Sequence, residues 1–396
     1  MIFENYFYGL GVGALMGYFI PFAILVCVLA TLMTKFALAI KDKARLPDGV
    51  VGGILIGAIT SIPELITSIC VVVQSTTDTE VHASSVFGDV IGSNMFCMLI
   101  MSVVLIGTVV LFKHREANQI NTVSLTFMVI GTIFCFVACI FDNNGPIYNP
   151  DIAIPSPLVW NGFNFFSIFI FASYGIAVYS MIFGSKVVSA GVTGKGLKTK
   201  VKLPAVQKHE PSKFLQLPMW SLILLLVGSV VALTLSSLVL AASCGGLIVR
   251  WELPQVFGRT LLLGVATSLP ELVAVVNLAI NRRYNMVIDS MVGSCAFNMT
   301  ILFLSNMIYG CIATNPVGDP MFVLNDKGDT AVQLSLFLLQ CLFVLIYLVI
   351  NSRSVKSYLS NRQAITINAV LLGLSVLPYI SYITLGILEQ NGIIPY

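Results

Sequence analysis

The sequence carries little charge. Asp, Glu, Lys and Arg make up only 10% of its 396 residues, whereas 57% of the residues are hydrophobic and the mean hydropathy is +0.94. A soluble domain cannot bury that much apolar surface, so the composition indicates a polytopic membrane protein. The N-terminus lacks the basic, apolar and small-residue pattern of a cleaved signal peptide, so we expect the first apolar segment to be retained.

Histidine is scarce, and cysteine follows no organised pattern. The three histidines all lie outside the apolar segments, and the nine cysteines include no Cys-x-x-Cys pair. These absences argue against a disulfide framework and against a histidine-based metal or catalytic site in the membrane. The apolar segments also contain no evident pair of nucleophile and base. We therefore predict that the protein is not an enzyme and uses no cofactor.

Ten apolar segments are long enough to cross a bilayer. They lie near residues 14–40, 50–74, 85–112, 119–141, 161–184, 217–244, 256–280, 287–310, 331–350 and 363–388. Gly245-Gly246 leaves open an earlier end for the sixth segment. The segments predict an all-α membrane protein with ten transmembrane helices.

The basic residues predict the orientation of these helices. If the loop after the first segment lies inside, 18 of the 21 Lys and Arg residues fall on the cytoplasmic side, while many acidic residues fall outside. This is a strong positive-inside pattern. We therefore expect a multi-pass protein of the cell membrane with both termini extracytoplasmic. The net charge of +3 comes mostly from a basic loop at 186–216, so it does not indicate nucleic-acid binding.

A two-part motif occurs twice. Residues 57–69 read GAITSIPELITSI and residues 264–276 read GVATSLPELVAVV, 207 positions apart. GDVIGSNMFCM at 88–98 is matched by DSMVGSCAFNM at 289–299, 201 positions apart, so the first half has about six extra residues in the stretch 75–84.

The repeat divides the chain into two halves of five spans each. We predict a first five-helix repeat at 1–185, the cytoplasmic basic loop at 186–216 and a second repeat at 217–396. Because five is odd, the two halves must enter the membrane from opposite sides. Such inverted repeats are typical of secondary transporters, whose binding site lies near the middle of the bilayer between the repeats.

The repeated motif places one carboxylate in each half of the chain. Glu64 and Glu271 lie near the middle of their spans, where a charge is costly unless it is paired or hydrated. No Lys or Arg lies at a matching depth, so mobile cations are the expected partners. Pro63 and Pro270 remove a backbone hydrogen bond, and a glycine six residues before each proline loosens the same turn. These glycines are Gly57 and Gly264, and the freed carbonyls add oxygen ligands.

Hydroxyl groups surround both carboxylates. They belong to Thr60, Ser61, Ser93, Thr267, Ser268 and Ser294. Oxygen-rich sets of this kind bind hard cations such as Na⁺ and Ca²⁺. Four residues beyond each serine of the second motif come Cys97 and Asn298. The amide oxygen of Asn298 is a neutral ligand for a hard cation, whereas Cys97 offers no such oxygen.

Charge balance indicates exchange of ions. Two carboxylates carry a charge of −2, which one Ca²⁺ or two Na⁺ neutralise equally well. Both ions accept the same oxygen ligands and would compete for one site. A carrier that reorients only when its charge is balanced would couple the movement of the two ions.

The paired motifs resemble those of the Ca²⁺/cation antiporter superfamily, specifically its sodium/calcium exchanger family. The resemblance implies that Glu64 and Glu271 are central ligands used alternately by Ca²⁺ and Na⁺. It implies Na⁺ sites on one side of the centre at Thr60, Ser61 and Ser294, and on the other side at Thr267, Ser268 and Ser93. It also implies that the first and sixth helices slide across the rest during alternating access.

The sequence departs from the family pattern at three places. The family usually has glycine just before the Thr-Ser pair, where this chain has Ile59 and Ala266. Cys97 stands where the family has Asn or an acid, which removes or softens one ligand and leaves room for Mn²⁺, Cd²⁺ or another divalent cation. The third departure is the insertion at 75–84, on the outer side.

We predict an antiporter that exchanges Na⁺ for Ca²⁺ or a related divalent cation. The alternative is a proton-coupled exchanger of Mn²⁺, Mg²⁺ or Ca²⁺, although the Gly-Asn-Ala-x-Glu-His motif typical of that branch is absent. A cation channel is disfavoured because an inverted repeat is typical of carriers. Each chain holds a whole site, so we expect function as a monomer within the lipid bilayer.

Overall fold

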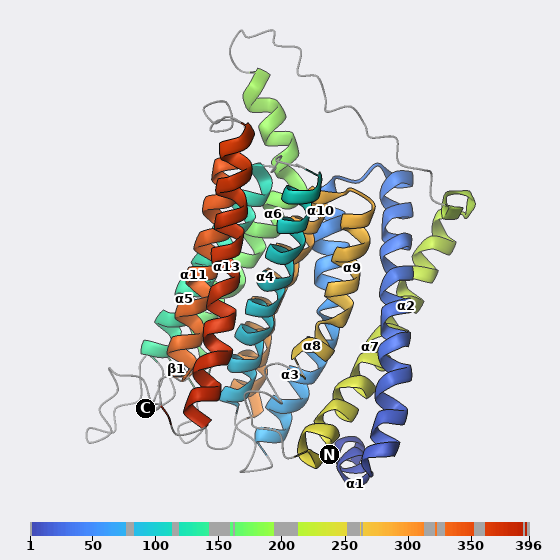
Figure 1. Cartoon of the computed structure of the whole chain (residues 1–396), viewed down its shortest axis with the longest axis vertical. Coiled ribbons are helices and arrows are strands. Elements are labelled where there is room, and N and C mark those ends of the chain that lie inside the picture. The colour runs from blue at the N-terminus through green and yellow to red at the C-terminus, as the bar shows by residue number, and fades with distance from the viewer. Residues whose placement is uncertain are drawn as a thin grey trace.

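The structure is a computed structural model of the whole chain. It describes residues 2–76, 83–112, 119–141, 159–160, 163–193, 213–251, 262, 264–312, 321–322, 329–351, 361–390 and 393. Helices account for nearly all of these residues (Figure 1). The small exception is a pair of antiparallel strands, β1 (Val159–Trp160) and β2 (Phe163–Asn164), with Val159 opposite Asn164.

Each of the ten predicted apolar segments overlaps at least one described helix, although residues 256–261 and 263 of the seventh segment lie outside the described residues. Their bounds are α1 Ile2–Gly9, α2 Val12–Ala44, η1 Val50–Ala58, α3 Ile62–Ser75, α4 Ser84–Phe112, α5 Gln119–Ile140, α6 Phe166–Thr193, η2 Lys213–Gln216, α7 Met219–Arg250, α8 Gly264–Thr267, α9 Leu269–Ile280, α10 Tyr284–Ile312, α11 Asp329–Asn351 and α13 Asn361–Gln390. Most of the 75–84 insertion, at residues 77–82, lies outside the described residues. Of the basic loop predicted at 186–216, residues 194–212 also lie outside them, while α6 continues to Thr193 and η2 takes up residues 213–216.

The sixth segment does not end at Gly245-Gly246, so that alternative is wrong. Helix α7 continues to Arg250. A side chain at Gly246 would collide with Leu15, 2.8 Å away, and with the carbonyl oxygen of Phe7, 3.1 Å away. The glycine therefore allows the N-terminal segment to pack closely against α7 and does not terminate the helix.

Seven of the described helices are long and apolar enough to span a bilayer, with mean hydropathies from 1.6 to 2.6. The helices η1 and α3 add an eighth span if this bent pair, with its 42° angle, crosses as one unit. Two shorter apolar stretches, Phe166–Ile182 in α6 and Leu269–Ile280 in α9, lie among them. The composition of these helices shows a multi-pass membrane protein.

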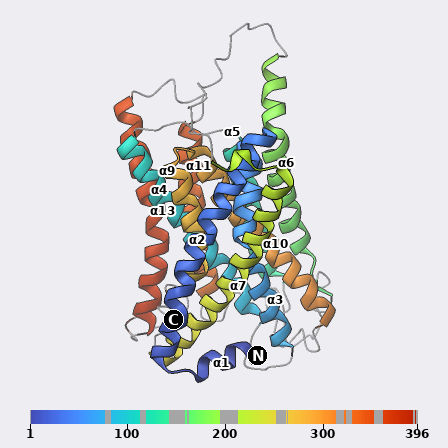
Figure 2. The same cartoon turned by 90° about the vertical axis from the view of Figure 1, so that its right-hand side faces the viewer.

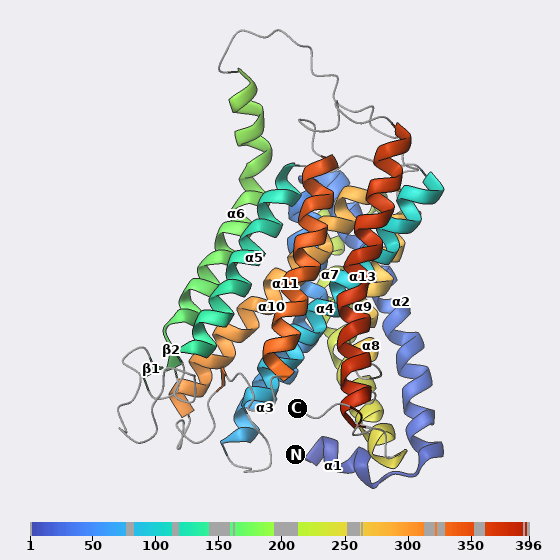
Figure 3. The same cartoon turned by 60° about the vertical axis from the view of Figure 1, so that its left-hand side comes forward.

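Helices α2 and α7 pack against each other along their length at one side of the molecule (Figures 1 and 2). Helix α10 lies in the interior, and 83% of its apolar window is buried. It contacts η1, α3, α4, α5, α6 and α9. Helix α1 and the C-terminal end of α13 lie at the same end of the molecule (Figure 3).

Both copies of the Thr-Ser-x-Pro-Glu motif break a helix at the same place. The backbone of Ser61 has φ −90° and ψ 8°, and that of Ser268 has φ −90° and ψ 13°. A new helix begins after each serine, with Pro63 and Pro270 in its first turn, where the missing N–H of proline costs nothing. The interruption predicted from the prolines is therefore present, and the break itself is at the serine.

Candidate functional site

The two helix breaks bury the two repeated carboxylates. Glu64 lies in the first turn of α3 and Glu271 in the first turn of α9. Their side chains are only 9% and 1% exposed, and the two carboxylates are close enough to interact electrostatically. The structure thus brings together two acids that are 207 residues apart in the sequence.

Close packing of backbones positions the first Thr-Ser pair. The helix η1 is a π-helix, a form that is frequent at functional sites. A Cβ atom on Gly57 would collide with the carbonyl oxygen of Ser290 and would lie 2.8 Å from the amide nitrogen of Ser294, and one on Gly293 would overlap the backbone of Gly53. Only glycine allows η1 to lie this close to α10.

This contact joins hydroxyls from the two repeats. The Ser61 and Ser294 hydroxyl oxygens are 2.5 Å apart, and the Ser61 hydroxyl also lies 3.3 Å from Oε1 of Glu271, as a potential donor. The hydroxyls of Thr60 and Ser61 both face the Glu271 carboxylate. Four predicted ligands, contributed by both repeats, therefore form one cluster.

The two threonines hold equivalent positions in their repeats. The Thr60 hydroxyl donates to the Gly57 carbonyl at 2.9 Å, and the Thr267 hydroxyl donates to the Gly264 carbonyl at 3.2 Å. In both halves, the carbonyl of the glycine predicted from the repeated motif thus accepts a hydrogen bond from the threonine hydroxyl.

The second motif forms a cluster of amides. Asn298 on α10 donates to Oδ1 of Asn94 on α4 at 3.0 Å, and its nitrogen also lies 3.4 Å from the Ser93 hydroxyl. Asn94 donates in turn to the carbonyl of Cys295 at 3.2 Å. The sequence interpretation missed Asn94, although the 201-residue offset aligns it with Cys295 and would have identified it.

The second predicted set of hydroxyl ligands makes fewer direct contacts between the two repeats than the first set, Thr60, Ser61 and Ser294. The predicted partners are Thr267, Ser268 and Ser93. The Ser268 hydroxyl is buried without a hydrogen-bond partner among the described residues, and the Ser93 hydroxyl faces the Asn298 amide. The direct contact that Ser61 makes with Ser294 therefore has no counterpart at Ser268.

Unpaired oxygen atoms mark the centre of this region. Both carboxylate oxygens of Glu64, Oε2 of Glu271, the Ser268 hydroxyl and Oδ1 of Asn298 are buried without a partner in the described part of the chain. Buried polar atoms are nearly always hydrogen-bonded, so five unpartnered oxygens on four of the predicted site residues require an explanation. The ion pairs described are Lys41–Asp48 and Arg283–Asp42, which do not involve the glutamates. Cations are the ligands that these oxygens suit.

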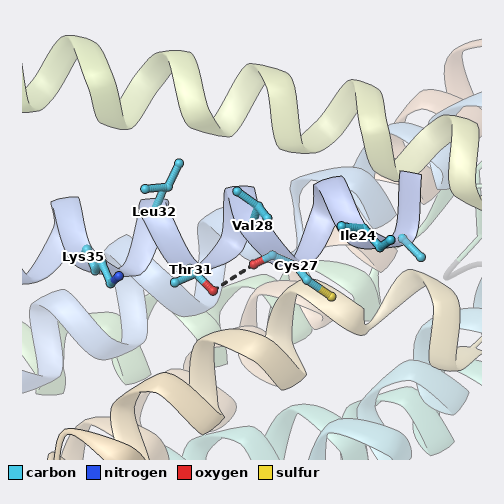
Figure 4. A pocket seen from close by; sticks show the side chains of 7 residues that line it. Ile24, Cys27, Val28, Thr31, Leu32 and Lys35 are labelled. Carbon is cyan, nitrogen blue, oxygen red and sulfur yellow. Dashed lines mark hydrogen bonds between the residues drawn. The ribbon is translucent and has the colours of Figure 1, made fainter. Parts of the chain in front are cut away.

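A groove along α2 lacks the carboxylates and unpartnered oxygens of the candidate site. It encloses about 520 Å³ and is lined by Ala23, Ile24, Cys27, Val28, Thr31, Leu32 and Lys35 (Figure 4). Its lining includes a lysine and no carboxylate, and the Thr31 hydroxyl is already bonded to the Cys27 carbonyl at 2.8 Å. The groove is therefore unsuited to cations.

Solved structures of the sodium-calcium exchanger NCX_Mj share this fold. The structure from crystals soaked with 10 mM Na⁺ and 10 mM Sr²⁺ matches with a TM-score of 0.60 at 16% identity, covering 94% of this chain and 99% of that chain. The structure soaked with zero Na⁺ and Ca²⁺ matches with a TM-score of 0.55 at 17% identity over the same shares. At this identity the likeness establishes the fold alone. No curated protein matches the sequence.

The sequence itself places the chain in a family. The profile described as "Sodium/calcium exchanger protein" matches residues 14–188 and 220–387. These two stretches cover most of the chain, and each contains one copy of the two-part motif. This is a family of membrane transporters, so the match confirms the resemblance drawn from the motifs. The chain belongs to the sodium/calcium exchanger family.

Proposed function

We propose that this protein exchanges Na⁺ for Ca²⁺, or for a related divalent cation, by alternating access. The observation that carries the proposal is the set of buried, unpartnered oxygens around Glu64 and Glu271. Leaving charged or polar groups buried without partners costs several kcal/mol. Bound cations remove that cost, and a membrane carrier can exchange them.

The two carboxylates set the total charge of the ions. One Ca²⁺ between Glu64 and Glu271 gives a neutral site, and so do two Na⁺. The Ser61–Ser294 contact beside Glu271 supplies neutral oxygens for one Na⁺. Ser268 and Asn298 offer unpartnered oxygens on the other side. Ions that share these ligands exclude one another, which is the requirement for exchange.

The proposal includes a topology of ten spans in two inverted repeats, at 1–185 and 217–396, joined by the basic loop at 186–216. Support comes from the correspondence of the described helices with the ten apolar segments. It also comes from α1 and the end of α13, which lie at the same end of the molecule, as an even number of crossings requires (Figure 3). The positive-inside pattern assigns that end to the outside of the cell membrane. Both repeats contribute to one site, so a monomer is sufficient.

Ion fluxes in vesicles test the function directly. The full chain is reconstituted into proteoliposomes loaded with Na⁺, and Ca²⁺ uptake is measured after dilution into Na⁺-free buffer. We expect uptake that requires internal Na⁺ and stops when K⁺ replaces it. Uptake of Ca²⁺, Mn²⁺ or Mg²⁺ that follows an imposed pH gradient and ignores Na⁺ would establish the proton-coupled alternative. Unitary currents in planar bilayers would establish a channel.

A further inference from the structure

Two buried asparagines join α4 to α10 within the second motif. Asn94 on α4 and Asn298 on α10 are 0% and 1% exposed. The Asn298 side-chain nitrogen donates to Oδ1 of Asn94 at 3.0 Å, and the Asn94 side-chain nitrogen donates to the backbone carbonyl of Cys295 at 3.2 Å. We call Asn94 and Asn298 the amide pair.

The backbone carbonyl of Cys295 fixes the way in which the Asn94 amide is turned. A carbonyl oxygen can only accept a hydrogen bond, so the Asn94 atom that faces it must be the nitrogen. The Asn94 oxygen then faces Asn298. Because this oxygen also can only accept, the Asn298 atom 3.0 Å away must be the nitrogen. Turning either amide around would set two acceptors against each other, so one backbone atom determines the orientation of both side chains.

Two further contacts hold this arrangement. The Cys295 thiol donates to the backbone carbonyl of Asn94 at 3.7 Å, so these two residues bond each other reciprocally between α4 and α10. The Asn298 nitrogen also lies 3.4 Å from the Ser93 hydroxyl. The nitrogen of Asn298 is thus directed at α4, whereas its Oδ1 is buried without a partner in the described part of the chain. The atom left over is the one that suits a hard cation.

The unpartnered oxygen belongs to the same polar region as the carboxylates. Asn298 lies four residues beyond Ser294, which places both side chains on one face of α10, about 6 Å apart along the helix axis. Ser294 lies 2.5 Å from the Ser61 hydroxyl, which in turn lies 3.3 Å from Oε1 of Glu271. The amide pair is therefore next to the candidate ion site.

A second pair of buried asparagines shows the alternative role, which is to bond two helices for stability alone. Asn351 on α11 and Asn368 on α13 each donate to Oδ1 of the other at 2.8 Å. Both amide oxygens of that pair are satisfied. In the amide pair, by contrast, a bond runs from Asn298 to Asn94 and the Asn298 oxygen is left over among the described residues. A purely structural pair gains nothing from a buried oxygen that lacks a partner.

We propose that Asn94 is a positioning residue that turns the Asn298 amide so that its oxygen, and not its nitrogen, faces the transported cation. An amide oxygen is a ligand for Na⁺ and Ca²⁺, whereas the amide NH₂ group is a donor and cannot be one. The proposal deepens the proposed function and rests on it, since it assumes that the exchanged cation binds in the region of Glu64, Glu271 and Asn298.

The positioning role belongs to the first repeat alone. The 201-residue offset places Cys295 at the position equivalent to Asn94, and Cys97 at the position equivalent to Asn298. Neither cysteine can replace an amide that orients or an amide oxygen that binds a hard cation. Loss of Asn94 is therefore not compensated by the other repeat.

A double-mutant cycle on the purified full-length protein, titrated calorimetrically with Ca²⁺ in Na⁺-free buffer, tests the proposal. Asn94→Ala should weaken Ca²⁺ binding by about 10-fold or more, since residues that orient a ligand change metal affinity by roughly 10- to 100-fold. In the Asn298→Ala background the same substitution should change the affinity by less than about 2-fold, because no amide remains to be oriented. The matched control Asn351→Ala also removes a buried amide, and should lower the melting temperature without changing the Ca²⁺ affinity.

A merely structural role for Asn94 predicts a different result. If Asn94→Ala weakens Ca²⁺ binding equally in the wild-type and Asn298→Ala backgrounds, Asn94 does not act through Asn298 and the proposal is overturned. A structure of the wild-type protein with bound Ca²⁺ needs no variant to fold. The Asn298 side chain should lie about 2.3–2.6 Å from the ion, and a bound ion that lacks this contact overturns the proposal as well.

These outcomes are distinct from those that test exchange. Coupled effects on Ca²⁺ binding, in a protein that shows no Na⁺-driven Ca²⁺ uptake, support the positioning role and refute the exchange. Na⁺-driven uptake together with independent effects of the two substitutions supports the exchange and refutes the positioning role. A wild-type protein that does not bind Ca²⁺ would overturn both.

Discussion

Replacement of Gly57 by alanine should damage both folding and transport. The new Cβ atom would lie 2.8 Å from the Ser294 nitrogen, whereas ordinary contacts begin at 3.4 Å, and it would lie closer still to the Ser290 carbonyl oxygen. Both obstacles are backbone atoms of α10, so no side chain can rotate away. The helix η1 must therefore move outward by at least 0.6 Å. Overpacking of this kind costs about 1–3 kcal/mol of stability.

The same displacement reaches the candidate ion site. Ser61 follows η1 and lies 2.5 Å from Ser294, so an outward shift of η1 lengthens this contact and moves the Ser61 hydroxyl relative to Glu271. We expect slower Na⁺-dependent Ca²⁺ uptake in Gly57→Ala proteoliposomes and a lower melting temperature in detergent. The matched control is Gly175→Ala, because a Cβ there meets nothing within 4 Å and alanine favours a helix by about 1 kcal/mol. If the two variants melt and transport alike, the close approach of η1 to α10 is unimportant and the reasoning is refuted.

Three further predictions concern charge, hydrogen bonding and the N-terminal helix. Glu64→Gln and Glu271→Gln should each abolish Ca²⁺ uptake into Na⁺-loaded vesicles, since one carboxylate cannot balance Ca²⁺; near-normal uptake in both variants would refute the site. Asn368→Ala should lower the free energy of unfolding by about 1–2 kcal/mol, because it leaves Oδ1 of Asn351, 2.8 Å away, without its partner; the exposed Ser335→Ala should have no effect in the same denaturant titration. Arg250→Ala should speed hydrogen exchange in α1, whose end it holds by bonds to the carbonyls of Tyr8, Gly9 and Leu10; Arg283→Ala should not, and equal exchange in both would show that these bonds do not hold α1.

Hydropathy predicted the helices well because a membrane span needs about 20 apolar residues and little else. The helix breaks were also predictable, since Pro63 and Pro270 remove hydrogen bonds locally. The π-helical form of η1 was not predicted, because no local sequence signal marked it. Helix α1 has only eight residues, too few for a periodic signal.

Contacts between helices that are distant in the sequence could not be predicted in the same way. The family resemblance placed Ser61 and Ser294 in one set, but their 2.5 Å contact depends on how closely η1 approaches α10. Likewise, the repeat alignment makes Asn94 equivalent to Cys295 and Cys97 equivalent to Asn298, whereas the crossing of α4 and α10 places the Asn298 amide 3.0 Å from Oδ1 of Asn94. Residues that occupy equivalent positions in the two repeats are therefore not the residues that contact each other in the structure.

The asymmetry of the site lies in its side chains and not in its backbone. Ser61 and Ser268 break their helices with nearly the same dihedral angles, and Thr60 and Thr267 bond the same glycine carbonyl in each repeat. Yet Ser61 contacts Ser294 and the Glu271 carboxylate, whereas the Ser268 hydroxyl has no partner in the described chain. An inverted repeat that alternates between two conformations must hold its halves unequally in each of them. The proposed alternating access therefore predicts such a difference between Ser61 and Ser268 in any one conformation.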